Sequence, residues 1–149
     1  MKGGEIDMDK KKLTAYVDGS YYKKTRSYSY GCVYILPDGS VETESGHGNN
    51  EKLAVHRNVA GEILGAMAAV TKALDDRYDE LELFYDYTGI EGWGTGRWKT
   101  NVQVTQNYAE FMRKAQKELT VIFTKVNAHT GVEYNEMADT LSKNALGIA

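Results

Sequence analysis

Two aspartates follow apolar segments that would normally be buried, and they are the residues in this sequence best placed to do chemistry. Asp18 ends the run 13–17, and Asp86 ends the alternating segment 80–85. A carboxylate removed from water protonates, pairs with a cation or coordinates a metal ion. No Lys or Arg occurs between positions 13 and 22. The absence of a local cation favours a metal ion or a proton as the partner of Asp18.

Two further acids border the apolar faces of predicted helices. Glu62 lies beside a stripe with three- and four-residue spacing, which predicts an amphipathic helix from Leu53 onward. The stripe consists of Val55, Val59, Ile63, Met67, Val70 and Leu74. Asp139 lies beside the buried face expected for a last helix, whose members are Tyr134, Ala138, Leu141 and Ala145. Thr130 and Glu133 have the spacing of a capping box at the start of that helix.

Four acids that converge without cations would form a site for a hard divalent cation. Mg²⁺ prefers oxygen ligands, and it takes its remaining ligands from water and substrate phosphate. Two such ions about 3.5–4 Å apart would activate an attacking water and stabilise the leaving oxygen of a phosphodiester. The acids therefore predict metal-dependent phosphodiester hydrolysis if the fold brings them together.

The hydrophobic pattern predicts an α/β fold that could bring the acids together. We expect strands over 13–20, 28–36, 40–47, 80–87 and 120–126, and helices from residue 53, over 103–118 and after residue 130. The strand–helix–strand crossover places the fourth strand parallel to the first. If these strands pair, the order is 3-2-1-4, and Asp18 and Asp86 lie side by side where the order reverses.

The composition fits one globular domain. The chain has 149 residues, of which 42% are hydrophobic and 26% charged, and its net charge of −3 argues against generic polyanion binding. The lone Cys32 excludes an internal disulfide and is expected in the core of a strand. We expect a flexible tail over 1–12 and a catalytic domain over 13–149. No secretion signal or membrane span is recognised, so we expect a cytoplasmic monomer that binds no membrane.

The ordered motifs resemble those of type 1 ribonuclease H from about residue 13 to 147. The matching segments are Tyr16–Ser20, Asn58–Glu62, Phe84–Tyr87, Ala128–Gly131 and Asn135–Asp139. The resemblance implies a five-stranded mixed sheet in the order 3-2-1-4-5, with helices on both faces. It also implies two-metal hydrolysis of the RNA strand of RNA–DNA hybrids, with two Mg²⁺ ions or Mn²⁺ as a substitute. The implied metal ligands are Asp18, Glu62, Asp86 and Asp139.

The resemblance also assigns roles in proton transfer and substrate binding. His129 matches a mobile histidine that assists proton transfer or product release. Asn58, Gly19 and Ser20 match the surroundings of the RNA 2′-hydroxyl, the group that distinguishes RNA from DNA. The DNA strand would contact Trp93 and Trp98, with Thr100 and Asn101 at one of its phosphates. Asn135, also expected among the substrate-binding residues, stands where some relatives carry an additional acid, so either the second metal ion is held less tightly or Glu136 assists.

The sequence departs from the family pattern in one respect and leaves alternatives open. Between Asp86 and residue 103 there is no room for the basic, substrate-binding protrusion of some members, so hybrid binding would be weaker. Local positive potential could come from Lys23, Lys24, Arg26, Arg97 and Lys99. The alternatives are another nuclease of the same superfamily and a non-catalytic hybrid-binding module. A nucleotide-phosphate site is disfavoured, because the glycines at 92–96 have neither P-loop nor dinucleotide-binding spacing.

Overall fold

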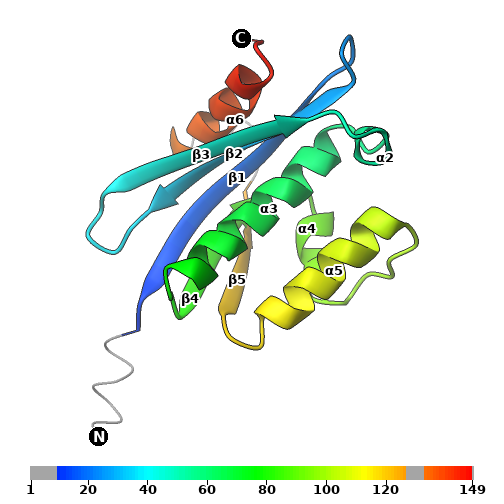
Figure 1. Ribbon diagram of the computed structural model, residues 1–149. Helices are drawn as coiled ribbons and strands as arrows, with labels where there is room; N and C mark the ends of the chain where they lie inside the picture. Colours follow the sequence, from blue (N-terminus) through cyan, green and yellow to red (C-terminus); the bar gives the residue numbers. More distant parts are fainter. Residues whose placement is uncertain (1–9, 127–132, 149) are drawn as a thin grey trace, which may run out of the picture.

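The computed structural model describes residues 10–126 and 133–148, which form one sheet with helices on both of its faces (Figure 1). The strands are β1 Lys12–Tyr22, β2 Ser27–Ile35, β3 Val41–Gly48, β4 Glu80–Tyr85 and β5 Thr120–Lys125. The helices are α2 Glu51–Ala54, α3 Asn58–Asp75, α4 Gly89–Gly94, α5 Gln103–Ala115 and α6 Glu133–Ala145.

The sheet order is β3-β2-β1-β4-β5, which confirms the predicted topology. The first three strands form an antiparallel meander, and β4 and β5 add to it in parallel. The ladder between β1 and β4 ends at the pair Tyr16 and Phe84. Asp18 and Asp86 each lie two residues beyond this pair, so both aspartates stand just past the carboxyl end of the parallel pairing of β1 and β4.

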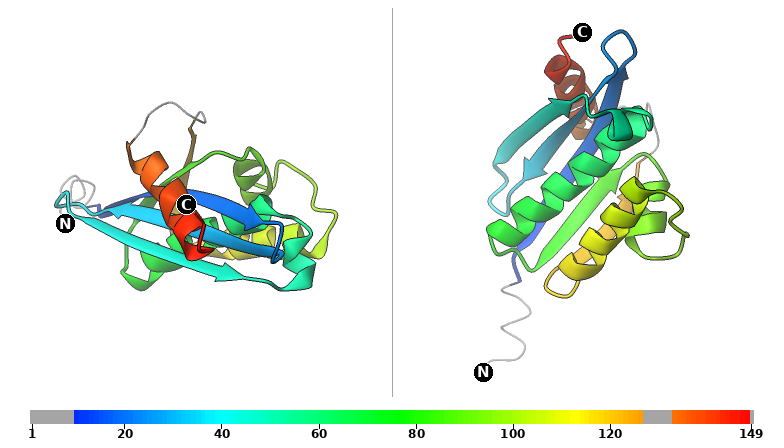
Figure 2. Two further views of the ribbon diagram at one scale, coloured as in Figure 1. Left: turned by 90° about the horizontal axis from the view of Figure 1, so that it is seen from above. Right: turned by 45° about the vertical axis from the view of Figure 1, so that its right-hand side comes forward.

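Helices α3, α4 and α5 cover one face of the sheet, and α6 crosses β1, β2 and β3 on the other face (Figures 1 and 2). Alternation along β1 sends Leu13, Ala15 and Val17 into the core beneath α3, where all three are fully buried. The α3 face that meets them is rich in alanine, so the helix backbone lies close to the sheet. Apolar burial of this kind contributes about 1.5–3 kcal/mol for each large side chain.

The region before Glu62 differs from the prediction. The helix expected from Leu53 is interrupted, since α2 ends at Ala54 and α3 begins at Asn58. Val55 was predicted on the buried stripe but is 63% exposed in the turn between the helices. Arg57 takes φ 55° and ψ −131°, which no α-helix permits, and this breaks the continuous helical period.

Three smaller differences concern the ends of elements. Strand β1 continues to Tyr22, so the hairpin loop is shorter than expected. The connection rich in glycine and tryptophan contains the helix α4, and α5 ends at Ala115 rather than near residue 118.

Cys32 is fully buried in β2, as predicted. Within the described residues, no helix has the length and apolar character needed to cross a membrane.

Candidate active site

A pocket of about 540 Å³ opens at the carboxyl ends of β1 and β4, beside the first turns of α6. Three of the four predicted acids, Asp18, Asp86 and Asp139, line it. Its remaining lining residues are Gly19, Asn135, Glu136, Thr140 and Lys143. The structure therefore gathers acids separated by more than a hundred residues at the edge where the predicted sheet order places them.

Asp18 points toward α6 because of the pairing of its strand. It stands opposite Gly31 of β2, and cross-strand partners share one face of a sheet. A methyl group at Gly31 would lie 2.3 Å from the carbonyl oxygen of Ala138, so α6 packs directly against the β2 backbone. This close approach brings Asp139, the next residue of α6, to the aspartate of β1.

Glu62 reaches the site from the opposite face of the sheet. Helix α3 and strand β1 meet at Gly19 and Gly61, where a methyl group on Gly19 would lie 2.4 Å from the Glu62 nitrogen. A methyl group on Gly61 would overlap the carbonyl oxygen of Ser29. Two glycines thus hold the first turn of α3 against the sheet, and the Glu62 side chain is only 2% exposed.

The site contains more acids than cations, and the acids affect one another's pKa values. Burial raises the pKa of Asp18 to about 6; the Gly19 amide opposes this rise, and Asp139 adds to it. Burial also raises the pKa of Glu62 well above its usual value, and Asp18 and Asp86 act in the same direction. Among the described residues, Glu62 Oε1 is a buried side-chain oxygen without a hydrogen-bond partner.

A serine network fixes α6 over the site. Ser142 is fully buried, and its hydroxyl donates to the carbonyl oxygen of Asp139 at 2.8 Å. That donation leaves the Ser20 hydroxyl to donate to Ser142 Oγ at 2.6 Å, and Ser29 donates to the Ser142 carbonyl oxygen at 2.5 Å. The serines of β1 and β2 therefore position the turn of α6 that carries Asp139. The Ser20 side chain is occupied by this contact, and the prediction for the 2′-hydroxyl concerned the backbone around Gly19 and Ser20.

Lys143 and Thr140 line the site but were not singled out from the sequence. Lys143 Nζ lies 3.0 Å from Asp139 Oδ2, one helical turn away, and both side chains are partly exposed. A search of the last helix for cations at i+4 from Asp139 would have found the lysine. Thr140 follows Asp139 and carries no comparable sequence signal.

The acids satisfy part of the requirement for a metal site. Within the described residues, no group of three or more His, Cys, Asp or Glu side chains is arranged to hold a metal ion. The donor set nevertheless fits a hard cation, because it offers only carboxylate oxygens, one of them buried and unpartnered. Burial, and to a smaller extent Asp139, raise the pKa of Asp18, and a bound cation would stabilise the ionised carboxylate that this environment disfavours.

The other predicted residues lie at varying distances from this pocket. His129 falls outside the described residues. Asn58 is exposed at the first position of α3, four residues before Glu62. Trp93 and Trp98 form a T-shaped pair with ring centroids 5.8 Å apart, and Trp98 is 39% exposed. Thr100 joins Trp93 in a different pocket beside α5, and Asn101 is exposed nearby.

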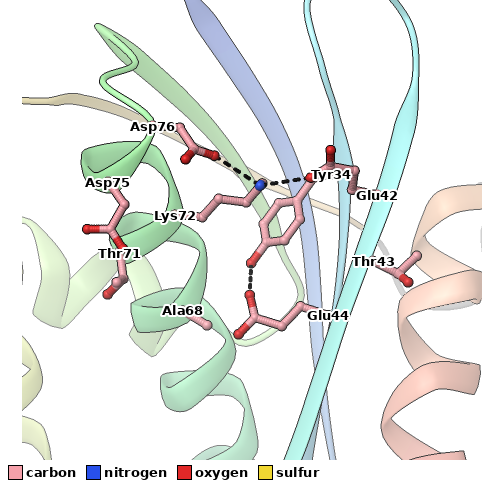
Figure 3. A pocket seen from close by; sticks show the side chains of 9 residues that line it. All are labelled: Tyr34, Glu42, Thr43, Glu44, Ala68, Thr71, Lys72, Asp75 and Asp76. Carbon is pink, nitrogen blue, oxygen red and sulfur yellow. Dashed lines mark hydrogen bonds and ion pairs between the residues drawn. The ribbon is translucent and has the colours of Figure 1, made fainter.

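Another pocket, of about 480 Å³, lies between α3 and the strands β2 and β3 (Figure 3). Lys72 pairs there with Glu42 at 2.9 Å and with Asp76 at 3.0 Å, and Glu44 accepts a hydrogen bond from Tyr34 at 2.7 Å. Glu42, Glu44 and Asp76 therefore each have a cationic or hydroxyl partner, unlike Glu62 Oε1 beside Asp18.

A mixed sheet in this order, with clustered acids at the carboxyl ends of its central parallel strands, defines an α/β protein of the ribonuclease H-like class. The RNase H family model matches residues 10–147, and the chain belongs to that family. Family membership supports a nuclease that acts on RNA–DNA hybrids. The comparison with curated proteins gave no significant match.

Solved structures agree with this assignment. RNase H1 from the halophilic archaeon Halobacterium salinarum NRC-1 is 25% identical, with a TM-score of 0.75 over 91% of this chain and 98% of the other. The N-terminal RNase H domain of Rv2228c from Mycobacterium tuberculosis, solved as a fusion with maltose-binding protein, is 18% identical. Its TM-score is 0.76, over 92% and 94% of the two chains.

A third structure is LC11-RNase H1 in complex with an RNA/DNA hybrid. It is 15% identical, with a TM-score of 0.68 over 90% of this chain and 99% of the other. At this identity the likeness concerns the fold. The predicted type 1 ribonuclease H family and the predicted sheet order are thus both confirmed.

Proposed function

We propose that this chain is an endonuclease that hydrolyses the RNA strand of RNA–DNA hybrids with the help of divalent cations. The observation that carries the proposal is the buried carboxylate of Glu62, whose Oε1 has no hydrogen-bond partner, beside Asp18 and Asp86 at the carboxyl edge of an RNase H sheet. Binding alone would gain nothing from four acids facing a polyanion, because they repel phosphate. This cost argues against a non-catalytic hybrid-binding module.

The four acids would hold the cations, with Mg²⁺ as the expected ion and Mn²⁺ as a substitute. Bound cations would supply an activated water and stabilisation of the leaving oxygen. Asp18 and Asp86 offer oxygens from the sheet, Glu62 from beneath it and Asp139 from α6. The serine contacts of α6 and the glycine contacts of α3 hold these side chains in place before substrate arrives.

Lys143 would pair with Asp139 in the free protein and with a substrate phosphate in the complex. Its ammonium group balances part of the carboxylate charge when no cation is present, since the two groups lie 3.0 Å apart. Arriving phosphate is an alternative partner for the same ammonium group, because a flexible lysine side chain readily exchanges partners. The pocket therefore contains one cation placed to attract the substrate backbone toward the acids.

Substrate selection would rest on residues around the pocket. Asn58 and the Gly19 backbone are the candidates for contact with the 2′-hydroxyl, and Trp93 and Trp98 for contact with the DNA strand. The exposed ring of Trp98 offers an apolar surface to a sugar or base. His129 is proposed to assist proton transfer or product release.

The test is cleavage of a strand-labelled RNA–DNA hybrid, beside duplex RNA, duplex DNA and single-stranded RNA, with Mg²⁺, Mn²⁺ or chelator. We expect metal-dependent loss of the RNA strand of the hybrid alone. Asp18→Asn should abolish cleavage and leave hybrid binding measurable. Asp75→Asn is the matched control, because Asp75 is an exposed acid at the far end of α3.

Two results would contradict the proposal. Undiminished cleavage by the Asp18→Asn variant would remove the basis for the metal-ligand assignment. Hybrid binding without cleavage by the wild-type protein, in either metal, would favour the non-catalytic module. Preference for a DNA duplex or a branched DNA would instead favour another nuclease of the superfamily.

A further inference from the structure

The hairpin between β1 and β2 forms a basic groove with the turn between α2 and α3. The groove has a volume of about 380 Å³ and contains no Asp or Glu in its described lining. It is lined by Tyr21, Lys23, Arg26, Ala54, Val55 and Arg57. Three of these six residues are therefore cationic, on a chain whose net charge is −3.

The cations of the groove lack acidic partners. Over residues 10–126 and 133–148, none of Lys23, Arg26 and Arg57 takes part in an ion pair. Arg57 instead lies over the ring of Tyr21, with its guanidinium carbon 5.9 Å from the ring centroid. Unpaired cations in a concave surface create a positive potential that attracts anions.

The backbone holds two of these cations in conformations that other residues adopt more easily. Arg26 has φ 53° at the end of the hairpin loop, and Arg57 has φ 55° before α3. Glycine or asparagine is the usual occupant of such positions. Arg77 also has a positive φ, but it follows the end of α3, where a left-handed residue ends many helices. Strain shared by two arginines of one groove points to a role for their side chains.

The position of the groove relates it to the proposed nuclease site. Tyr21 lies three residues beyond Asp18 on β1, which is about 10 Å along a strand. Asn58, next to Arg57, lies four residues before Glu62 on α3, which is about 6 Å along a helix. With phosphates spaced by about 3.4 Å along a strand, the near edge of the groove lies about two to three nucleotides from the acids.

We propose that this groove binds the phosphate backbone of the RNA–DNA hybrid on one side of the cleavage position. The inference rests on the proposed function, because it takes the hybrid as the ligand. Lys23, Lys24 and Arg26 would contact phosphates from the hairpin, and Arg57 from the start of α3. These contacts are independent of sequence and of metal, so they are measurable when chelator prevents cleavage.

The experiment measures binding of a fluorescent 18-base-pair hybrid by anisotropy, in chelator, across a range of NaCl concentrations. The test variant is Lys23→Gln/Lys24→Gln/Arg26→Gln, and the control is Arg77→Gln/Lys114→Gln/Lys117→Gln. Each lost phosphate contact makes the negative slope of log K against log[salt] shallower by about 0.7–0.9. We expect a slope shallower by about 2 and a Kd raised about 10- to 100-fold at low salt for the test variant alone.

Replacement of the strained arginines by glycine gives a second readout. Arg57→Gly and Arg77→Gly should both raise the melting temperature by a few degrees, because glycine adopts these conformations without strain. Only Arg57→Gly should also reduce the salt slope, by about 0.7–0.9. A gain in stability together with a loss of binding rules out misfolding as the cause of the loss.

The outcomes separate the groove from the proposed activity. Salt slopes equal to that of the control variant would overturn the inference, even in a protein that cleaves the hybrid. Absence of hybrid binding by the wild-type protein would overturn it as well. Reduced slopes in a protein that binds but does not cleave would support the groove and contradict the nuclease.

Discussion

Removal of one carboxylate charge should make this protein more stable while it abolishes activity, and Asp18→Asn is the variant that shows this most directly. Asp18 accepts a hydrogen bond from the Gly19 amide at 2.9 Å, and an asparagine oxygen retains that contact. The substitution keeps the shape of the side chain. It removes a negative charge that is poorly solvated and faces Asp139.

The size and sign of the effect follow from the raised pKa of Asp18. Folding shifts the pKa from 3.8 to about 6, and each unit corresponds to about 1.4 kcal/mol. Ionisation therefore costs the folded state up to about 3 kcal/mol at neutral pH. Because the folded-state pKa is raised, the cost is absent below pH 3.8, grows between 3.8 and about 6, and is complete above that range.

The assay is thermal unfolding in chelator at several pH values between 4 and 8. For a chain of this length, 3 kcal/mol corresponds to a rise of about 5–10 °C in melting temperature. We expect the variant to exceed the wild type by this amount at pH 8 and to match it at pH 4. Asp75→Asn, at an exposed position, should stay close to the wild type throughout.

Added Mg²⁺ should reduce the difference in melting temperature between the variant and the wild type. A ligand that binds the folded state alone stabilises it more the tighter it binds, so Mg²⁺ should raise the melting temperature of the wild type more than that of the variant. Equal stability of the two proteins at pH 8 in chelator would refute the reasoning. So would a stability gain in the variant that is the same at pH 4 as at pH 8.

Three further substitutions test the scaffold of the site. Gly61→Ala should destabilise the protein by about 3 kcal/mol or more in urea unfolding, because the added methyl group overlaps the strand backbone. Gly65→Ala is the control: its methyl group would meet its neighbours at 3.3 Å or more, so this substitution should be tolerated. Ser142→Ala should cost about 1–3 kcal/mol by the same assay, since the hydrogen bonds of its buried hydroxyl with Ser20 and with the Asp139 carbonyl oxygen are lost. Lys143→Gln should lower the Mg²⁺ concentration that gives half-maximal cleavage, because Asp139 loses a competing cation; a higher requirement would contradict this role.

The antiparallel meander and the crossover to β4 were predictable from strong and local signals, whereas the complete five-strand order was implied by the family resemblance. Alternation marked the strands, a period change marked the crossover helix, and chain topology then left few ways to pair β1 and β4. The same logic placed Asp18 and Asp86 at one edge. Ala138 was predicted as buried from the period of the apolar positions and Cys32 from the tendency of a free cysteine to lie in the core, and both are fully buried.

Features that depend on backbone contact between distant elements could not be predicted. The break before α3 arises from the conformation of Arg57, a residue type that carries no turn signal. The buried serine network joins positions more than a hundred residues apart, and a serine in a helix normally suggests a solvated face. The sequence placed Glu62 beside an apolar stripe, but only the glycine contacts explain why it is buried without a partner.

The glycines, the serines and the acids form one arrangement in which packing works against electrostatics. Close approach at Gly19 and Gly61 fixes α3, and the contact of Gly31 with α6 fixes the helix on the other face. Both helices are thereby held where Glu62 and Asp139 face Asp18, although burial and, to a smaller extent, Asp139 raise the pKa of the aspartate. The glycine contacts of α3 and of α6 thus hold the carboxylates in place for a cation, at a cost in electrostatic energy. Substitutions that relax either contact should reduce metal affinity before they unfold the protein.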